Sequence, residues 1–320
     1  MVDRSARKEF SMLTRRRFLE LCSAAAAAPA LRAEPRFRVG ITTDTRHGWE
    51  HDVLLSFREA AEVGFHAVET FYQHVLPWWD KPQELQKILD GLHLRFDTVS
   101  NGGSMKTQFE NPALASQIID EHLRLVRWIK GFGCDHLKIN TGGRRPGGTT
   151  REDLVQMAKT MNEIGKRTAD EGLKFGVHAH LWTQLQDRSE IDRLMELTDP
   201  RHVYFVLDTG HITMAGMDPV ELTRAYVSRI IEFHLKDTRP ADRGGHKGPL
   251  PRREGYTDIG KRIFLELGNG GVDFPGILAV LRKNKWDGWL TVELDSTDTT
   301  PQQSAAQSKK YLEDVLHLEV

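Results

Sequence analysis

The chain has 320 residues, with 44 Lys and Arg against 45 Asp and Glu, 39% apolar residues and two cysteines. This length is enough for one large domain or two small ones with a sizeable core, and the mixed composition excludes a disordered chain. The balanced charge argues against a polybasic nucleic-acid binder, and two cysteines cannot build a dense disulfide framework.

Residues 1–33 have the layout of an export signal. Arg15–Arg17 form a basic region, an Ala-rich apolar region follows, and Ala28–Ala33 provide a small-residue exit. The stretch Thr14–Leu19 resembles the twin-arginine signal, whose cargo crosses the membrane already folded. The alternative is an Ala-rich amphipathic helix of the mature fold. We therefore expect an exported, periplasmic protein whose mature part begins at residue 34.

The mature part is expected to be mildly acidic and free of membrane spans. Removal of residues 1–33 leaves 37 basic and 42 acidic residues, a net charge of −5. Cys22 follows Leu21 rather than a small residue, which argues against a lipoprotein anchor. Cys134 then remains as a single cysteine, so no internal disulfide can form. No stretch of the mature part approaches the roughly 20 apolar residues of a membrane span.

Eight short runs of strand pattern alternate with segments of helical pattern. The predicted strands are 38–43, 66–71, 94–100, 136–140, 174–178, 203–208, 230–235 and 289–293. The predicted helices are 51–63, 82–91, 112–131, 151–171, 188–198, 219–228, 274–284 and 303–316. Pro112 and Pro219 suit a first helical turn, and Gly64, Gly91 and Gly172 follow helix ends where a left-handed residue is favoured.

Eight strand–helix units over about 280 residues match a (β/α)₈ TIM barrel, which typically has ~250 residues. Residues 34–320 are therefore predicted to form a single α/β domain of this kind. A doubly wound open sheet is the alternative, but no G-x-G-x-x-G follows the first strand. The pairs Gly102-Gly103 and Gly142-Gly143 lack a third glycine and are interpreted as tight loop turns.

Five predicted strands carry imidazole or carboxylate groups at their carboxyl ends, the rim where such barrels place their chemistry. The polar residues there are Glu69, His178, His180, Asp208, His211, His234, Lys236, Asp237 and Glu293. Imidazole and carboxylate together suit a borderline divalent ion. We therefore predict one metal ion, with Mn²⁺ or Co²⁺ favoured and Zn²⁺ or Mg²⁺ as alternatives. Its predicted ligands are His178, Asp208, His234 and Glu293.

Other residues at this rim suggest proton transfer and charge stabilisation. His180 lies two residues after the first predicted ligand, on the same side of an extended strand, and an imidazole can act as a general base near neutral pH. Lys236 could supply positive charge beside a developing oxyanion, or it could pair with a neighbouring carboxylate. Asp208 and His211 could instead cap a helix, and capping is our preferred interpretation of Asp237.

Other residues at the barrel mouth provide candidates for substrate binding. Glu69 could contact a substrate or form an ion pair inside the barrel mouth. Trp182 could stack against a sugar or pack in the barrel mouth, and the same alternatives hold for other loop tryptophans. These are Trp49, Trp78 and Trp79. Residues 239–265, rich in Arg and Gly, are expected to form a loop over the mouth that shapes specificity, with a disordered surface insertion as the alternative.

At these residues the chain resembles the xylose-isomerase-like sugar isomerase/epimerase superfamily, and within it the inosose dehydratase branch. The resemblance covers about residues 174–294 and rests on several motifs. They are His178-Ala-His180, Asp208-Thr-Gly-His211, His234-Leu-Lys236-Asp237, and residues 268–274 and 288–293. The resemblance implies a TIM barrel that holds a divalent metal at the ends of strands five to eight and removes a proton beside a carbonyl.

The resemblance also implies roles for single residues. Asp208, His234 and Glu293 match the metal-binding Asp, His and Glu of the superfamily. His211 matches a histidine that contacts the substrate near the metal. Arg239 matches an arginine that binds substrate oxygens.

Two features depart from the better known branches. His178 stands where tagatose-type epimerases have a glutamate, which weakens the epimerase interpretation. The spacing of His178 and His180 is instead similar to the strand-five pattern of dehydroshikimate and inosose dehydratases. The export signal is the second departure, because inosose dehydratases are usually cytoplasmic, and it suggests a polyol or keto-sugar formed outside the cytoplasm.

The leading hypothesis is a metal-dependent dehydratase or lyase that acts on a keto-sugar or keto-polyol through α-proton abstraction by His180 and an enediolate. The first rival is an isomerase or epimerase, in which Glu293 would donate a proton opposite a second base. The second rival is a non-catalytic exported carbohydrate-binding protein. DNA-repair endonuclease chemistry is disfavoured by the net charge of −5. The expected partner is a small carbohydrate and not a nucleic acid, and self-association stays open.

Overall fold

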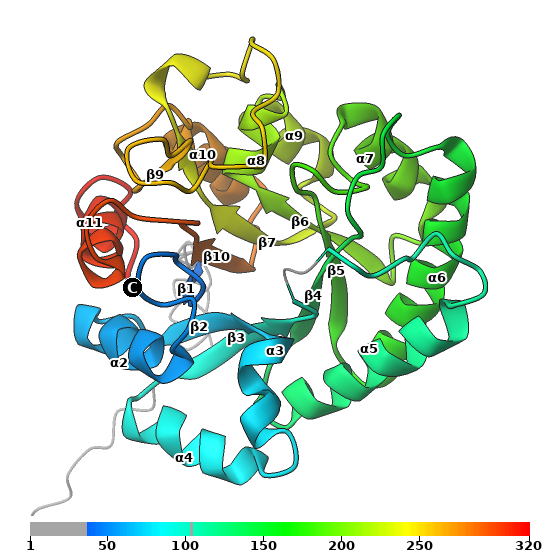
Figure 1. The fold of residues 1–320 in the computed structure, drawn as a ribbon, viewed down its shortest axis with the longest axis horizontal. Helices are drawn as coiled ribbons and strands as arrows, with labels where there is room; N and C mark the ends of the chain where they lie inside the picture. The colour runs from blue at the N-terminus through cyan, green and yellow to red at the C-terminus, as the bar shows by residue number, and fades with distance from the viewer. Residues whose placement is uncertain (1–36, 103–104) are drawn as a thin grey trace, which may run out of the picture. The chain divides into compact units, whose positions relative to one another are not determined.

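The computed structural model describes residues 37–102 and 105–320 (Figure 1). The predicted export signal at residues 1–33 lies outside the described residues. Eight strands form the wall of a barrel, and the longer helices surround it. The strands are β1 (Arg38–Thr42), β2 (Ala67–Phe71), β3 (Arg95–Ser100), β4 (His136–Asn140), β5 (Lys174–His178), β6 (Val203–Asp208), β7 (Ile230–Leu235) and β10 (Trp289–Val292).

The strands are parallel and hydrogen-bonded in the order β3-β2-β1-β10-β7-β6-β5-β4. The two end strands also lie beside each other. Thr98 Oγ1 donates to the carbonyl of His136 at 2.9 Å, and the N–H of Asn140 donates to Asn101 Oδ1 at 2.8 Å. The sheet is thus a nearly closed barrel in which β1 lies opposite β5, and the predicted (β/α)₈ fold is confirmed.

Local capping signals explain where the helices around the barrel begin and end. They are α2 (Val53–Val63), α4 (Pro82–Gly91), α5 (Ala115–Lys130), α6 (Arg151–Asp170), α7 (Arg188–Leu197), α9 (Pro219–Tyr226), α10 (Phe274–Lys283) and α11 (Pro301–Asp314). The Asp52 carboxylate accepts from the N–H of Leu55 at 2.9 Å before α2, which ends at Gly64 with φ 99°. Thr150 and Asp153 form a capping box at the start of α6.

All the predicted strands and helices are present, with ends that differ by at most three residues. The sequence did not predict the shortest elements, which span too few residues to show a periodicity. They are α3 (Tyr72–Val75), η2 (Leu76–Trp78), α8 (Thr209–Met214), β8 (Asp237–Thr238), η3 (Pro240–Asp242) and β9 (Phe264–Leu265). The placement of Gly91 after a helix was wrong, because it belongs to the last turn of α4 and His93 takes the left-handed conformation, with φ 56°.

The interior of the barrel contains a layer of polar side chains that hydrogen-bond to one another. A Cβ atom at Gly40 would lie 2.5 Å from Asp97 Oδ2, so only glycine leaves room for that carboxyl group. Thr291 Oγ1 lies 2.9 Å from Asp97 Oδ2 and 2.8 Å from Glu232 Oε1. His136 donates from Nε2 to Glu232 at 2.9 Å, and although burial opposes protonation, Glu232 raises the pKa of His136 to about 10. This layer fills the barrel below its carboxyl-end rim.

The apolar core lies between the barrel and the helices, where residues such as Phe57 and Phe233 are fully buried. Cys134 belongs to this core, and burial raises the pKa of its thiol well above the usual value. Within residues 37–102 and 105–320, no helix combines the length and the apolar character needed to span a bilayer.

Candidate functional site

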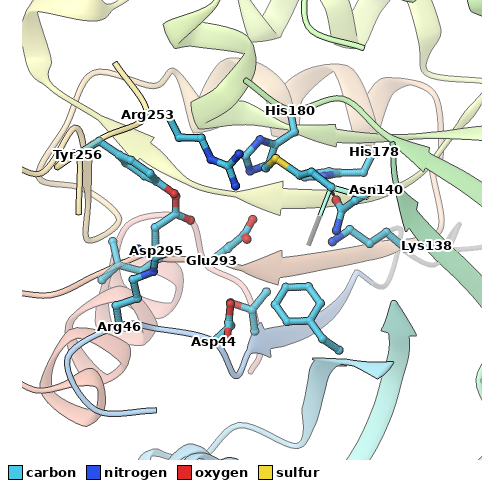
Figure 2. A pocket seen from close by; sticks show the side chains of 14 residues that line it. Asp44, Arg46, Lys138, Asn140, His178, His180, Arg253, Tyr256, Glu293 and Asp295 are labelled. Carbon is cyan, nitrogen blue, oxygen red and sulfur yellow. Dashed lines mark hydrogen bonds between the residues drawn. The ribbon is translucent and has the colours of Figure 1, made fainter. Parts of the chain in front are cut away.

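A cavity of about 180 Å³ opens at the carboxyl ends of the barrel strands (Figure 2). Its polar lining comes from β4, from the end of β5 and the residues after it, from segments that follow β1 and β10, and from residues 239–265. The labelled residues are Asp44, Arg46, Lys138, Asn140, His178, His180, Arg253, Tyr256, Glu293 and Asp295. Such a lining suits a small, strongly hydrated ligand.

The four residues predicted as metal ligands come together beside this cavity. They are His178, Asp208, His234 and Glu293, and one donor atom of each lies within 4.8 Å of the others. The barrel topology explains the cluster, because β5, β6, β7 and β10 are consecutive neighbours and each places one of these residues at the same rim. All but Glu293 are buried, and the side chain of Glu293 is 12% exposed.

Two donor atoms of the cluster have no hydrogen-bond partner among the described residues. They are His178 Nε2 and Asp208 Oδ2, which lie 3.5 Å apart. The other carboxylate oxygen of Asp208 accepts from the N–H of His211 at 2.8 Å, so Asp208 caps α8 while Oδ2 accepts no hydrogen bond and has Lys236 Nζ as an ion-pair neighbour at 3.3 Å. Buried polar atoms normally have partners, and a borderline divalent cation would satisfy both. The donor set therefore fits such an ion.

Neighbouring side chains orient the two imidazoles. His178 Nδ1 donates to Asn140 Oδ1 at 2.7 Å, which leaves Nε2 facing the cluster. His234 Nε2 donates to Glu69 Oε2 at 2.6 Å, which leaves Nδ1 in contact with Glu293. Such partners fix the tautomer and the ring orientation of metal-binding histidines.

Glu69 lies beneath the cavity rather than in its lining. Its Oε1 accepts from Lys138 Nζ at 2.9 Å, and both side chains are 1% exposed. Burial opposes ionisation of Glu69, but Lys138 and His234 outweigh it and lower the pKa of the carboxyl group. Of the two roles predicted for Glu69, the structure therefore shows the ion pair and not the substrate contact, because the side chain does not reach the cavity.

The electrostatic environment favours the metal-binding ionisation state in His178 and Glu293 and the protonated state in Asp208 and His234. Burial opposes protonation of His234, but Glu293 and Glu69 outweigh it and raise the pKa of that imidazole well above its usual value. Burial lowers the pKa of His178 well below its usual value, so the ring is neutral. Burial opposes ionisation of Glu293, but His234 and Lys236 outweigh it and hold the pKa of that carboxyl group well below its usual value. Burial raises the pKa of Asp208 to about 7 despite the nearby ammonium of Lys236. A bound cation would favour the carboxylate form of Asp208.

His180 lines the cavity, whereas His211 lies behind it. His180 Nδ1 donates to the carbonyl of Leu181 at 2.5 Å, so Nε2 is the nitrogen that can take up a proton. Burial and the charge of Lys236 lower the pKa of His180 to about 4, which keeps its ring neutral. The His211 ring centroid lies 3.4 Å from that of His180, and His211 is not part of the cavity lining. His211 therefore supports His180 instead of making the predicted substrate contact.

Lys236 is enclosed by carboxylates. Its Nζ lies 2.7 Å from Asp295 Oδ1, 3.1 Å from Glu293 Oε2 and 3.3 Å from Asp208 Oδ2. It is fully buried and does not line the cavity. The structure thus gives Lys236 the pairing position, in which it neutralises the carboxylates around the cluster, rather than the predicted place beside a substrate oxyanion.

Two other predicted substrate contacts lie outside the cavity lining. Arg239 donates from Nε to Asp242 Oδ2 at 2.9 Å, and its side chain is 46% exposed. Trp182 donates from Nε1 to the carbonyl of Pro251 at 2.9 Å, and its ring packs on Tyr256. Loop packing therefore accounts for Trp182. The other loop tryptophans are likewise absent from the lining, namely Trp49, Trp78 and Trp79.

Residues 239–265 lie at the cavity, as predicted for a loop over the mouth, and contribute Arg253 and Tyr256 to its lining. The antiparallel pair β8–β9 joins the two ends of this loop. Asp237 does not cap a helix, contrary to our preferred interpretation, but holds the chain that follows the loop. Its carboxylate accepts three hydrogen bonds of 3.0 Å from the N–H groups of Gly268, Gly270 and Val272.

Outside residues 239–265, the sequence analysis missed five charged or amide side chains of the lining. Two signals could have identified three of them, because Lys138 and Asn140 alternate on β4 and Asp295 lies two residues after Glu293. The other two have no such signal. They are Asp44 and Arg46, which follow β1 in an irregular segment.

Comparisons with known proteins agree with this architecture. The family described as xylose isomerase-like TIM barrel matches residues 57–315. Curated relatives include an inosose dehydratase of Clostridium tetani, which is 34% identical over 168 residues and is matched over 52% of this chain and 55% of that protein. An inosose dehydratase of Lacticaseibacillus casei is 33% identical over 173 residues and is matched over 53% of this chain and 57% of that protein. The chain spans about half the length of the curated relatives it matches.

Solved structures share the fold at low identity. A sugar phosphate isomerase/epimerase from Parabacteroides distasonis has a TM-score of 0.64 and 17% identity, with 92% of this chain and 98% of that chain covered. A probable 3-DHS dehydratase from Bacillus anthracis has a TM-score of 0.66 and 18% identity, with 87% and 98% covered. Since the family match covers most of the sequence, the chain belongs to the xylose isomerase-like TIM barrel family.

Proposed function

We propose that this protein is a divalent-metal-dependent enzyme that removes a proton beside the carbonyl of a keto-sugar or keto-polyol and eliminates a β-oxygen, a dehydratase or lyase. The observation that carries the proposal is the pair of buried donor atoms without a hydrogen bond, His178 Nε2 and Asp208 Oδ2, beside a polar cavity at the barrel rim. The inosose dehydratase relatives support elimination as the reaction class.

The metal would be held by His178, Asp208, His234 and Glu293, with Mn²⁺ or Co²⁺ as the favoured ions. When bound, such an ion polarises a carbonyl group and so acidifies the adjacent C–H bond. Asn140 and Glu69 orient the two imidazoles for this role.

The chain's own residues account for the proton transfer. His180 lines the cavity with a neutral ring whose Nε2 can accept the α-proton. The ammonium of Lys138 also lines the cavity and supplies positive charge near the developing negative charge of the substrate. Glu69 fixes this ammonium from below, so that it is positioned before the substrate arrives.

We further propose that residues 1–33 are a twin-arginine export signal and that the mature enzyme works in the periplasm. Folding before export would let the metal site form in the cytoplasm. The substrate would then be a carbohydrate encountered outside the cytoplasm.

The experiment that tests the function combines metal analysis with isotope exchange on the mature protein. We expect about one Mn, Co or Zn per chain, the single ion that the four-ligand cluster can hold, and metal-dependent deuterium uptake from D₂O at the carbon beside the ketone. His234→Ala and Glu293→Ala should lose the metal, whereas His180→Ala should keep the metal and lose exchange. His51→Ala, whose side chain is 90% exposed, is the control and should change neither.

Full metal occupancy in both ligand variants would contradict the site assignment. Absence of metal and of exchange in the parent protein would instead favour a carbohydrate-binding protein. Product analysis separates the reactions, because a lyase releases the β-oxygen and an epimerase returns an isomer of the same mass.

A further inference from the structure

The cavity holds a carboxyl group on the side opposite His180. Asp44 follows β1, and His180 follows β5, which lies four strands away from β1 in either direction around the barrel. Both residues line the cavity. In Figure 2, Glu293 lies between Asp44 on one side and His180 on the other. A substrate seated beside the metal cluster would therefore have these two groups on opposite faces.

Asp44 differs from the other carboxyl groups of the lining in its partners. Asp295 is bound to Lys236 at 2.7 Å, and Glu293 belongs to the metal cluster. Asp44 has no Lys or Arg partner within 4 Å among the described residues, and its nearest ion-pairing group is His74 Nε2 at 3.7 Å. Among the carboxyl groups of the lining, Asp44 is thus the one that is neither a predicted metal ligand nor paired with an ammonium, and no such partner holds it in the ionised form.

The surroundings of Asp44 also favour a proton on its carboxyl group. Partial burial and the charges of Asp295 and Glu293 raise the pKa of Asp44 to about 7, and Arg46 opposes them. About 41% of the side-chain surface remains exposed, so the group can exchange its proton with the cavity. A carboxyl group of this kind is suited to act as a general acid.

We propose that Asp44 is the catalytic acid that protonates the departing oxygen, so that His180 and Asp44 act from opposite faces and the elimination is anti. His180 Nε2 takes the α-proton, and its electron pair becomes the new C=C bond. The bond from the β-carbon to oxygen then breaks, and the Asp44 proton goes to that oxygen, which leaves as water or an alcohol. The inference deepens the proposed elimination and rests on it.

The test uses keto-sugars whose leaving oxygen can be varied. In methyl 3-ketoglucoside the proton is lost from C2 and methanol leaves from C1, whereas 4-nitrophenyl 3-ketoglucoside releases the weakly basic nitrophenolate. Asp44→Asn should slow elimination of methanol by about 100-fold or more, because that oxygen needs a proton. Elimination of nitrophenolate should slow by less than about fivefold, and recovered methyl substrate should still gain deuterium at C2.

Stereochemistry provides a test that does not depend on any variant. In the chair form, the α anomer places its C1 oxygen on the face opposite the C2 hydrogen, and the β anomer does not. The parent enzyme should therefore eliminate methanol from the α anomer at least about tenfold faster than from the β anomer, because only the α anomer orients the leaving oxygen toward Asp44.

The control is Asp80→Asn, which changes an exposed aspartate outside the cavity lining. Both variants should keep the metal content and the melting temperature of the parent. If Asp44→Asn slowed the elimination of both leaving groups equally, or if the β anomer reacted faster, the assignment of Asp44 as the acid would be wrong. The proposed function would then still stand. A C2 epimer as the product would overturn the assignment of Asp44 too, because the proton would then return to carbon. A parent protein with neither metal nor C2 exchange would overturn the proposed function itself and this inference with it.

Discussion

The hydrogen bond between Asn140 and His178 provides a sharp test of the metal cluster. Asn140 Oδ1 accepts from His178 Nδ1 at 2.7 Å, and His178 Nε2 faces the cluster without a partner. Asn140→Leu keeps a side chain of similar length but removes the acceptor, so the imidazole loses the bond that fixes its tautomer and its orientation. Loss of such a partner typically weakens metal affinity about 10- to 100-fold, or about 1.4–2.8 kcal/mol.

The assay is a competition titration of the metal-free protein with Mn²⁺ against a fluorescent chelator, without substrate. Asn140→Leu should raise the Kd about 10- to 100-fold, and Asn140→Asp should lower it, because a carboxylate partner makes His178 more basic. Asn284→Leu, an exposed position after α10, is the control. A change of less than about twofold in Asn140→Leu would show that His178 does not depend on this bond for metal binding, and the assigned orientation would be wrong.

Four further predictions concern Arg253, His180 and Cys134, two of them for His180. Arg253→Gln should raise KM about tenfold with little change in kcat, because this lining guanidinium has no carboxylate partner within 4 Å among the described residues. Arg252→Gln is the matched control, and equal effects of the two variants would contradict the prediction. Deuterium exchange should be nearly flat above pH about 5 and should fall as the pH drops through about 4, the pKa of His180 in the folded protein. Between pH about 6.5 and about 4 the unfolded chain binds the His180 proton before the folded protein does, because the unfolded histidine has a pKa of about 6.5. His180 should therefore lower stability as the pH falls through this range, and melts that show a gain there would refute this. Cys134 should react with a thiol reagent only after denaturation, since it is buried and its thiol pKa is raised.

Most of the fold could be predicted from the sequence because its signals are local. The eight strand–helix units are specified by their own periodicity and by caps such as Asp52 and Gly64. The short helix α8 was missed because it spans six residues, too few to show an amphipathic pattern. Its capping residue, Asp208, was nevertheless recognised as either a cap or a ligand, and the geometry allows both, because its two oxygens face different groups.

The site could be predicted only where strand ends determine it. His178 and His234 lie on strands, so their rim and their direction follow from the strand pattern. That pattern does not show which side chains reach the cavity, and Glu69 and Lys236 proved to be buried outside its lining. Arg239 was predicted from the resemblance alone, and nothing in the sequence indicated Arg253, because the path of an irregular loop depends on tertiary contacts that no periodicity records.

The clamp at the base of the 239–265 loop has a consequence for how such enzymes diversify. The pair β8–β9 and the Asp237 carboxylate close the loop at its base, while Arg253 and Tyr256 lie at the cavity. The stretch between the clamp points can therefore change in length and composition while the four-residue metal cluster keeps its own supports on the barrel. Grafting this stretch between relatives should transfer substrate preference as a single exchangeable module.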